Sequence, residues 1–447
     1  MLVLKGGTVV SSTGLEKRDL YIDSGKIVPP GPAGEIVDVS GRLLFPGFID
    51  SHTHLDMPVS GTVTADTFPT GTAAAIAGGT TVILDFATQD RGHTLQEALD
   101  VWHNRADGRC FCDYGFHMAV TDWNDATRRE LLSMEREGIT SYKAYMAYDA
   151  LRLEDDDLQA LLAATGALGA WLGCHCELGA EVNRNITTLL SAGKTGPAFH
   201  PLSRPNALES RAISRFLQLA RTAEGLPWIV HLSTGDGYRL IKENRDGGLP
   251  ILVESCPQYL TLTDELYSLP DFQGAKYVCS PPLRSANDKA ALLHAVKNGG
   301  IDILSTDHCS FNFRGQKELG RDDFSKTPNG LPGIEHRPAL IWSLGFGAEA
   351  MCRMMCENPA KAFGLWGRKG ALNIGFDADV VVWDPDTPSI LTAANQEMNC
   401  DYSPWEGFAL IGGPKAVYLR GQLAAENGKC LRTVSGEYLR RSQAILQ

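Results

Sequence analysis

Apolar, β-branched runs recur along the middle of the chain, and a segment with helical spacing follows most of them. The runs show little internal alternation of polar and apolar residues, which is typical of strands buried on both faces of a parallel sheet. Eight such runs lie at residues 43–55, 80–87, 113–121, 139–148, 170–177, 227–235, 250–260 and 301–311. Amphipathic stretches such as 95–106, 158–169 and 207–223 lie between them. This alternation predicts an α/β fold in which eight strands close into a (β/α)8, TIM-like barrel.

An open, doubly wound sheet is the alternative for the same alternation of strands and helices. Such a sheet normally carries a glycine-rich phosphate-binding turn after its first strand. The sequence has no such turn there, so the closed barrel is favoured.

The two ends of the chain have a different pattern, with short strand-like runs separated by glycine-containing turns. We therefore predict a small β-sandwich built from both termini, in residues 1–45 and 370–426. The barrel occupies residues 46–369 between them. The C-terminal tail, residues 427–447, is basic and partly amphipathic, and we expect it to contact another subunit.

Composition restricts the classes of partner. Hydrophobic residues make up 43% of the chain and charged residues 21%, as in folded globular proteins. The formal net charge of −12 argues against nucleic acid and anionic membranes as partners. No apolar run reaches the roughly 18 residues that a membrane span needs. The N-terminal stretch lacks the features of a signal peptide, and the eleven cysteines form no paired C-x-x-C sets, so we expect a cytoplasmic protein.

Two histidines separated by a single residue stand at the end of the first run, in GFIDSHTHLDM. Residues i and i+2 of a strand project to the same face, so His52 and His54 would enter one cavity together. A pair of solvated histidines at a polar strand end is the simpler alternative. Asp50 and Asp56 on either side are interpreted as supporting or turn residues.

Further polar residues lie at or near the carboxyl ends of other predicted strands, the end at which barrel active sites form. Lys143 lies in the fourth strand, His175 ends the fifth, His231 the sixth and Asp307 the eighth. His308, beside Asp307, is an equally plausible polar residue at this end. Four imidazoles, a carboxylate and a lysine converging on one rim predict a metal site.

Lys143 stands among apolar and aromatic residues in SYKAYMAY. An unpaired ammonium buried there would be costly, and a lowered pKa would leave a neutral, nucleophilic amine. Such an amine can take up carbon dioxide to form a carbamate, whose two oxygens can bridge two divalent cations. The alternative is a lysine that reaches solvent or pairs with Asp149.

Motifs spread over nearly the whole chain resemble those of the hydantoinase/dihydropyrimidinase family, which are cyclic amidohydrolases of the metal-dependent amidohydrolase superfamily. They are HTHLDMPVSGTVTADTF, GGTTVILDF, SYKAYMAY, VESCPQYL, CSPPLR, STDHCSF, TPNGLPG and DADVVVWDP. The late string DYSPWEGF is similar to the D-phenylhydantoinase branch in particular. The resemblance implies the same barrel and β-sandwich as the pattern above.

The resemblance also implies a ligand set for two divalent metal ions, with Zn²⁺ the expected ion. His52 and His54 would bind the more buried ion, and His175 and His231 the other. Lys143, carboxylated by CO₂ to N6-carboxylysine, would bridge them. Asp307 would complete the first site and transfer protons.

The activity implied by the resemblance is hydrolytic ring opening of cyclic amides and imides to N-carbamoyl amino acids by a metal-bridging hydroxide. The expected substrates are small 5-substituted hydantoins or dihydropyrimidines. Tyr148 would stabilise the oxyanion, and main-chain groups near Ser280 and Asn329 would hold the imide edge. The expected assembly is a homotetramer or a homodimer.

Three other functions stay open: a dihydropyrimidinase proper, an allantoinase or other imidase, and a non-catalytic scaffold of the collapsin-response mediator type. The filled ligand positions favour an enzyme over the scaffold. Apolar residues in the loops after the first and fourth strands predict 5-monosubstituted hydantoins with D-preference. Arg152 departs from this apolar pattern, and it either points to solvent or meets a substrate carboxylate. His117, on the third strand, is either a supporting or a core residue.

Overall fold

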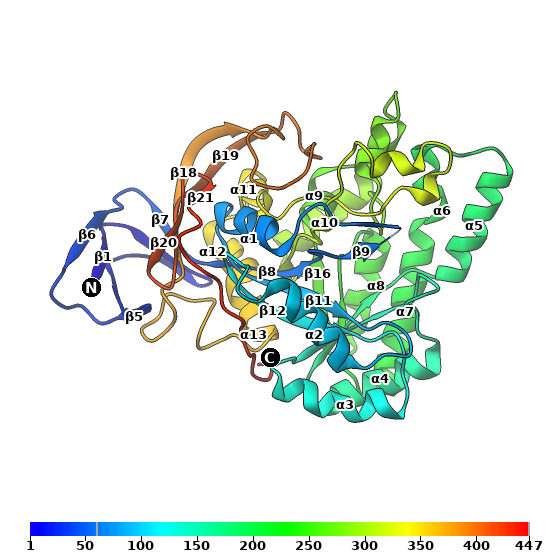
Figure 1. Cartoon of the computed structure of the whole chain (residues 1–447), viewed down its shortest axis with the longest axis horizontal. Helices are drawn as coiled ribbons and strands as arrows, with labels where there is room; N and C mark the ends of the chain where they lie inside the picture. The colour runs from blue at the N-terminus through cyan, green and yellow to red at the C-terminus, as the bar shows by residue number, and fades with distance from the viewer. Residues whose placement is uncertain (60, 446–447) are drawn as a thin grey trace.

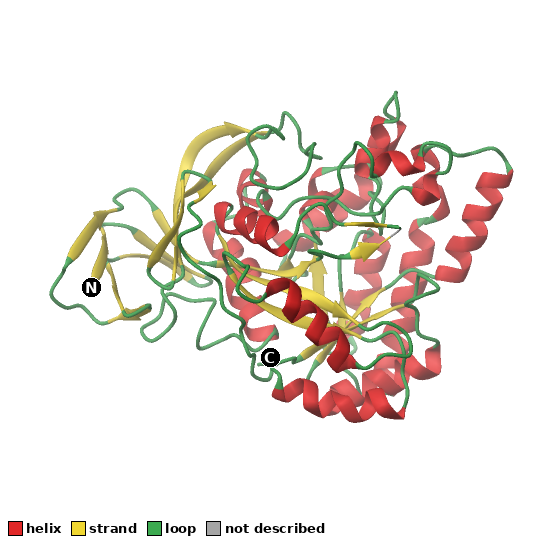
Figure 2. Cartoon of the chain, in the orientation of Figure 1, coloured by secondary structure: helices red, strands yellow, loops and turns green. Residues whose placement is uncertain are grey.

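The computed structural model of the protein describes residues 1–59 and 61–445. Figure 1 shows the two sheets of terminal strands on the left and a ring of strands surrounded by helices on the right. Figure 2 shows the same division, with most of the helices gathered around the ring. No helix in the described part of the chain is long and apolar enough to cross a membrane.

The ring contains eight parallel strands in sequence order, which confirms the predicted (β/α)8 barrel. They are β8 (Phe48–Thr53), β11 (Thr80–Thr88), β12 (Asp113–Ala119), β13 (Ser141–Tyr145), β14 (Trp171–His175), β15 (Pro227–Ile229), β16 (Leu252–Ser255) and β17 (Ile303–Leu304). The first predicted strand differs in one respect, because it is divided at Gly47 into β7 (Leu43–Pro46) and β8. A Cβ at Gly47 would lie 2.0 Å from the Thr81 hydroxyl oxygen, so any residue with a side chain would clash with Thr81 at this position.

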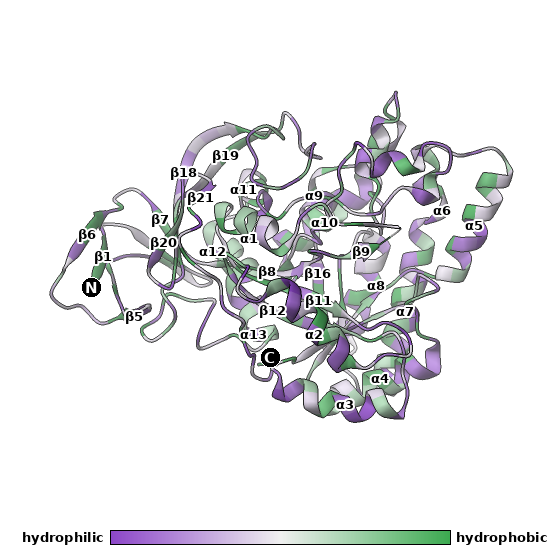
Figure 3. Cartoon of the chain, viewed as in Figure 1, coloured by the Kyte–Doolittle hydropathy of each residue, from purple (hydrophilic) through white to green (hydrophobic). Residues whose placement is uncertain are grey.

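The helices cover the outside of the ring. They are α1 (Phe68–Ala77), α2 (Leu95–Ala106), α3 (Asp125–Arg136), α4 (Asp155–Ala167), α5 (Gly179–Ser191), α6 (His200–Ser203), α7 (Asn206–Thr222), α8 (Gly235–Asp246), α9 (Pro257–Thr261), α10 (Ala286–Lys297), α11 (Arg337–Ser343), α12 (Ala348–Cys352) and α13 (Asn358–Ala362). Helix α2 begins at a capping box in which Thr94 and Glu97 bond each other's backbone N–H groups. Figure 3 shows hydrophilic and hydrophobic residues alternating along outer helices such as α5.

The termini form two further sheets, as predicted. One has the order β5 (Lys26–Val28), β4 (Leu20–Asp23), β1 (Leu2–Lys5), β6 (Glu35–Asp38). The other joins both ends of the chain in the order β21 (Lys429–Cys430), β20 (Gln422–Glu426), β19 (Ala409–Leu419), β18 (Val380–Ile390), β7, β2 (Thr8–Ser11), β3 (Gly14–Lys17). Leu4, Leu20, Leu44 and Val380 are buried between them in one apolar cluster.

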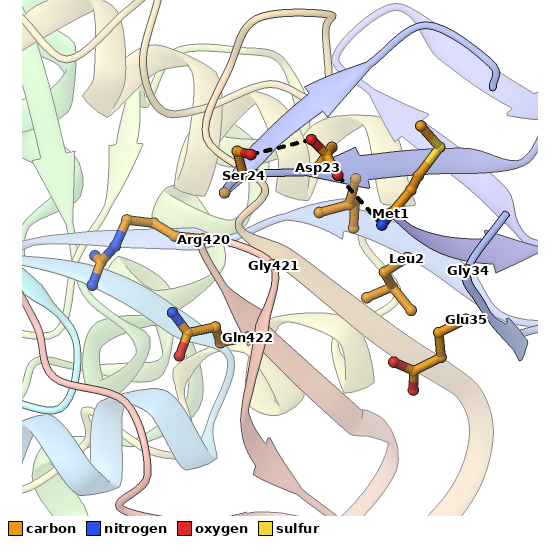
Figure 4. A pocket seen from close by; sticks show the side chains of 11 residues that line it. Met1, Leu2, Asp23, Ser24, Gly34, Glu35, Arg420, Gly421 and Gln422 are labelled. Atoms are coloured by element: carbon orange, nitrogen blue, oxygen red, sulfur yellow. Dashed lines mark hydrogen bonds and ion pairs between the residues drawn. The ribbon is translucent and has the colours of Figure 1, made fainter. Parts of the chain in front are cut away.

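A cavity of about 630 Å³ opens at the edge of these sheets. Figure 4 shows it between the N-terminal strand and the turn at Arg420 and Gly421, with the Met1 ammonium near Asp23. These two charges are 3.3 Å apart and partly exposed. None of the predicted site residues is among those that line this cavity.

The C-terminal tail packs on the barrel of its own chain. The Leu439 N–H donates to the Tyr114 carbonyl over 2.7 Å, and the Ser442 N–H donates to the Gly364 carbonyl over 3.0 Å. Leu439 is fully buried, and Arg441 donates to the Ser141 hydroxyl over 2.8 Å. The expected contact of this tail with another subunit stays a prediction.

The barrel closes where its first strand meets its last. The Arg337 guanidinium donates to the Ile49 and Leu304 carbonyls, each over 2.9 Å, and so joins β8 to β17. Asp50 accepts hydrogen bonds from the backbone N–H of Thr306 over 3.1 Å and from its hydroxyl over 2.7 Å. The fully buried Arg337 lies 3.7 Å from the Asp50 carboxylate, which gives the guanidinium a countercharge.

Removing this guanidinium should weaken the fold. In Arg337→Met, the Asp50 carboxylate and two carbonyls lose a buried partner, so the free energy of unfolding should fall by about 3–5 kcal/mol. The urea midpoint of unfolding measures the change. The exposed Arg239→Met on α8 is the matched control and should alter stability by less than about 1 kcal/mol. Equal midpoints for the two variants would contradict a closing role for Arg337.

Candidate metal centre

One cavity at the carboxyl ends of the barrel strands contains every predicted site residue. Its volume is about 800 Å³. The predicted residues that line it are His52, His54, Lys143, Tyr148, His175, His231, Ser280, Asp307 and Asn329. The barrel topology therefore brings together side chains from three strands, β8, β13 and β14, and from segments that follow strands.

His52, His54 and Asp307 form the first group, and their ligand atoms lie within 4.8 Å of one another. The Asp307 Oδ1 atom is 3.1 Å from His52 Nε2 and 3.2 Å from His54 Nε2. Two ligands of a tetrahedral zinc ion, each bound at about 2.0–2.1 Å, lie about 3.3 Å apart. The spacing and the nitrogen and carboxylate donors fit one divalent cation.

His175 and His231 form the second group. His175 Nδ1 is 3.0 Å from His231 Nε2, again the spacing of two ligands on one cation. Burial lowers the pKa of both imidazoles, so both are neutral at pH 7, as metal ligands must be.

Two buried glutamates orient these histidines, and the sequence analysis did not identify either. Glu254 on β16 lies 2.7 Å from His52 Nδ1, which directs Nε2 toward Asp307. Glu177 lies 2.7 Å from His175 Nε2, which directs Nδ1 toward His231. Carboxylates that hold the far nitrogen of a ligand imidazole fix its tautomer and raise its basicity. The sequence signal that could have identified Glu254 is an acidic residue inside an otherwise apolar strand, ILVES.

These carboxylates set the charge of the site. Although burial lowers the pKa of His52, Glu254 and Asp307 raise it to about 9. Although burial raises the pKa of Asp307, His52 and His54 hold it well below its usual range. Asp307 is therefore ionised at neutral pH and available to bind a cation or accept a proton.

Lys143 is buried in the centre of the site. Its side chain is 1% exposed, and its ammonium lies 5.1 Å from the Phe86 ring centroid and 5.5 Å from that of Tyr145. Among the described residues it has no ion pair. Asp149, the partner considered in the sequence analysis, instead contacts Arg152 at 3.2 Å and Asn183 at 3.0 Å. Burial lowers the pKa of Lys143, although Glu254 and Asp307 oppose the shift.

Three residues of the site have a left-handed backbone that is uncommon outside glycine. The φ angles are +66° at Tyr148, +37° at His231 and +52° at Asp307. Such conformations cost free energy and cluster where a fold must aim a functional side chain.

Other candidate residues lie outside the cluster. His308 faces away from Asp307, with Nε2 3.1 Å from Asp66 and Nδ1 accepting the Gly333 N–H over 3.0 Å. His117 bonds the Ser141 hydroxyl over 2.6 Å and the Ser51 carbonyl over 3.0 Å, so it supports the barrel interior. Arg152 pairs with Asp149 and Glu154 and does not line the cavity.

Comparison with known proteins relates this site to a family. The model of the amidohydrolase family matches residues 43–424. A D-hydantoinase of Streptomyces coelicolor is 41% identical over 94% of this chain and 93% of its own. A D-phenylhydantoinase of Escherichia coli is 36% identical over 99% of both chains. The crystal structure of a dihydropyrimidinase from Brevibacillus agri has a TM-score of 0.97 and 40% identity, covering 99% of both chains.

Removing the carboxylate behind His52 should weaken metal binding without removing a ligand. Glu254→Gln should lower the affinity for a divalent cation about 10–100-fold, because His52 loses its anionic partner. Competition with a chromogenic chelator measures this affinity. Glu243→Gln, on the exposed face of α8, is the control. An unchanged affinity in Glu254→Gln would show that Glu254 only fills space.

Proposed function

Because the chain belongs to the amidohydrolase family and, within it, to the hydantoinases, we propose that it hydrolyses cyclic amides to N-carbamoyl amino acids. The family is metal-dependent, and the chain has a His–His–Asp group suited to a metal ion. The observation that carries the proposal is the convergence of four imidazoles, Asp307 and an unpaired buried lysine in one cavity.

We propose two divalent cations, with Zn²⁺ the expected ion. His52, His54 and Asp307 would hold one, and His175 and His231 the other. Lys143, as a carbamate formed with CO₂, would bridge them. Burial lowers the pKa of Lys143, which favours the neutral, nucleophilic amine, and no carboxylate of the described residues lies within ion-pair distance of it. When bound, such cations lower the pKa of a water molecule and polarise the carbonyl group.

Asp307 would transfer the proton. Its carboxylate, ionised at neutral pH, accepts a proton from the attacking water and donates it to the ring nitrogen that leaves. Tyr148 would donate a hydrogen bond to the oxyanion of the tetrahedral intermediate. Burial raises the pKa of Tyr148 to about 12, so its hydroxyl keeps the proton that this donation requires.

The loops with Ser280 and Asn329 would hold the imide edge of the ring. Both residues line the cavity. The Ser280 hydroxyl and the Asn329 side-chain carbonyl oxygen are buried and have no hydrogen-bond partner within the described chain. Buried polar atoms are normally paired, so these two fit groups that bond a ligand.

The wall around the ring substituent is mainly apolar and aromatic. Met57, Val59, Tyr145 and Leu151 line the cavity, whereas Arg152 does not. This lining favours a 5-aryl or 5-alkyl substituent over hydrogen. We therefore propose 5-monosubstituted hydantoins as substrates, with the D-preference that the names of the relatives carry.

A dihydropyrimidinase is the second candidate, supported by the solved Brevibacillus agri enzyme of that name. A non-catalytic scaffold is disfavoured because every expected ligand position is filled. We further propose a homotetramer or homodimer, supported by the exposed apolar residues Ile390, Phe408 and Ile411 of strands β18 and β19 and their connection. A cytoplasmic location suits the eleven free cysteines.

A substrate panel tests the proposed function. Values of kcat/KM are measured for both enantiomers of 5-phenylhydantoin and for hydantoin, dihydrouracil and allantoin. The D-phenyl compound should exceed hydantoin by about tenfold or more, since burying two ring carbons contributes roughly 1.6 kcal/mol.

Asp307→Asn is the catalytic control for this panel. It keeps an oxygen near the imidazoles but removes the proton acceptor, so turnover should fall at least about 100-fold. A clear preference for dihydrouracil moves the assignment to dihydropyrimidinase, and no turnover of any cyclic amide refutes the proposal.

The carbamate bridge predicts a chemical rescue. Lys143→Ala should lose most of its metal and lower activity by orders of magnitude, because no oxygen then joins the two groups of imidazoles. Acetate or propionate should restore part of the activity by supplying that oxygen. Metal content by plasma mass spectrometry and turnover are measured with and without the acid. The exposed Lys194→Ala should match wild type, and full metal with near-normal turnover in Lys143→Ala would contradict the bridge.

A further inference from the structure

The buried lysine Lys317 lies outside the candidate metal centre. Its side chain is 0% exposed, and its ammonium donates to three main-chain carbonyls. The acceptors are Val278 at 2.7 Å, Pro328 at 2.6 Å and Gly330 at 2.7 Å. Each of the three ammonium protons therefore has one acceptor.

The three carbonyls belong to the two loops that line the imide side of the cavity. Val278 lies two residues before Ser280, and Pro328 and Gly330 flank Asn329. The loops also touch directly, through the Gly330 N–H and the Val278 carbonyl over 3.0 Å. A Cβ at Gly330 would lie 2.3 Å from the Cys309 carbonyl oxygen, so this backbone approach requires glycine.

Burying the charged side chain of Lys317 costs free energy unless its donors are satisfied. No carboxylate lies within ion-pair distance of Lys317 in residues 1–59 and 61–445, so burial of the charge is compensated only by carbonyl dipoles and the Phe311 ring 5.4 Å away. Burial lowers the pKa of Lys317 to about 8, and the ammonium with three donors still prevails at neutral pH. Only lysine offers three diverging donors on a flexible stem.

The preceding residue extends the same link to another wall of the cavity. The Gln316 side-chain amide donates to the Thr62 hydroxyl over 2.9 Å and to the Val63 carbonyl over 2.7 Å. Thr62 and Val63 form β10 (Thr62–Val63), which pairs with β9 (Pro58–Val59) after the first barrel strand. Pro58 and Val59 line the cavity on the side of the ring substituent.

We propose that Lys317 and Gln316 are positioning residues for two different parts of the substrate. Lys317 fixes the backbone of the loops that hold the imide edge, and Gln316 fixes the strand pair that faces the ring substituent. Neither residue contacts the predicted metal ligands, so both act through backbone that they hold in place. This inference rests on the proposed function, because it presumes a cyclic imide in the cavity.

The two roles predict different kinetic signatures. Every substrate presents the imide edge, so loss of Lys317 should raise KM for substituted and unsubstituted rings alike. Only a substituted ring reaches the strand pair, so loss of Gln316 should raise KM for that ring alone. Lys317 and Gln316 bond none of the candidate metal ligands, so kcat should change less than KM and metal content should stay constant.

The experiment compares Lys317→Gln, Lys317→Met and Gln316→Ala on hydantoin and D-5-phenylhydantoin in the metal-loaded enzyme. Glutamine keeps two donors and methionine none, so KM for both substrates should rise about tenfold in Lys317→Gln and further in Lys317→Met. Gln316→Ala should raise KM about tenfold for the phenyl compound and leave hydantoin within twofold of wild type. Lys326→Met and Gln96→Ala, both exposed, are the controls.

The possible results separate this inference from the proposed function. If the wild type opens neither ring, the proposed function fails. If the wild type is active and KM in Lys317→Gln equals that of wild type, the positioning role of Lys317 is refuted. The role is also refuted if kcat and metal content fall together while KM is unchanged, because that pattern indicates general damage to the fold. If Lys317→Met does not fold, Lys317→Gln and Gln316→Ala decide the outcome.

Discussion

Closure of the barrel is the constraint on which the metal centre depends. His52 and Asp307 stand about 250 residues apart in sequence, and their side chains come within 3.1 Å because the chain after β17 runs beside the end of β8, where Thr53 and His308 form a parallel bridge. These two strands share few backbone hydrogen bonds, and side chains complete their junction. Arg337 links their carbonyls, and Asp50 bonds both polar groups of Thr306. The stability of the fold and the geometry of the first ligand group therefore rest on the same few contacts.

Three buried lysines show how the surroundings of an ammonium decide its use. Lys369 lies between the carboxylates of Asp113, Asp377 and Asp379 at 2.6–2.9 Å, which raise its pKa despite burial, so it joins the sandwich to the barrel as a permanent cation. Lys317 has only carbonyl acceptors, and its pKa falls to about 8. Lys143 has neither kind of partner within the described chain, so its amine is the one most available for a reaction. The three lysines thus differ in use: Lys369 joins two domains, Lys317 bonds loop carbonyls, and Lys143 is the candidate metal bridge.

Periodicity made the framework predictable from the sequence, and it also located the candidate ligands that the barrel brings into one cavity. The i, i+2 spacing placed His52 and His54 on one strand face, and the ends of the apolar runs located His175, His231 and Asp307. Glu177 and Glu254 were missed because a single carboxylate in an apolar strand does not reveal which imidazole it meets across the barrel. The division at Gly47 was missed because β7 and β8 form one continuous apolar run, and only the approach of Thr81 separates them. Arg152 was ambiguous because its partners, Asp149 and Glu154, depend on the turn that follows Tyr148.

The cavity is lined by side chains from barrel strands and by side chains from the connecting segments. The imidazoles and Lys143 come from strands or strand ends, where neighbouring strands and buried carboxylates fix each ligand atom. The surfaces that we propose to face the imide edge and the ring substituent come from loops and from the short strand pair β9–β10. Side chains of the 312–320 segment link these surfaces, since the Lys317 ammonium bonds the Val278 and Pro328 carbonyls and the Gln316 amide bonds Thr62 of β10. With the roles proposed for Lys317 and Gln316, a change in this segment should alter which ring is held and leave the candidate ligands at the strand ends in place. Because neighbouring strands hold the candidate metal ligands in place, we expect substrate selectivity to change most easily where the loops are joined.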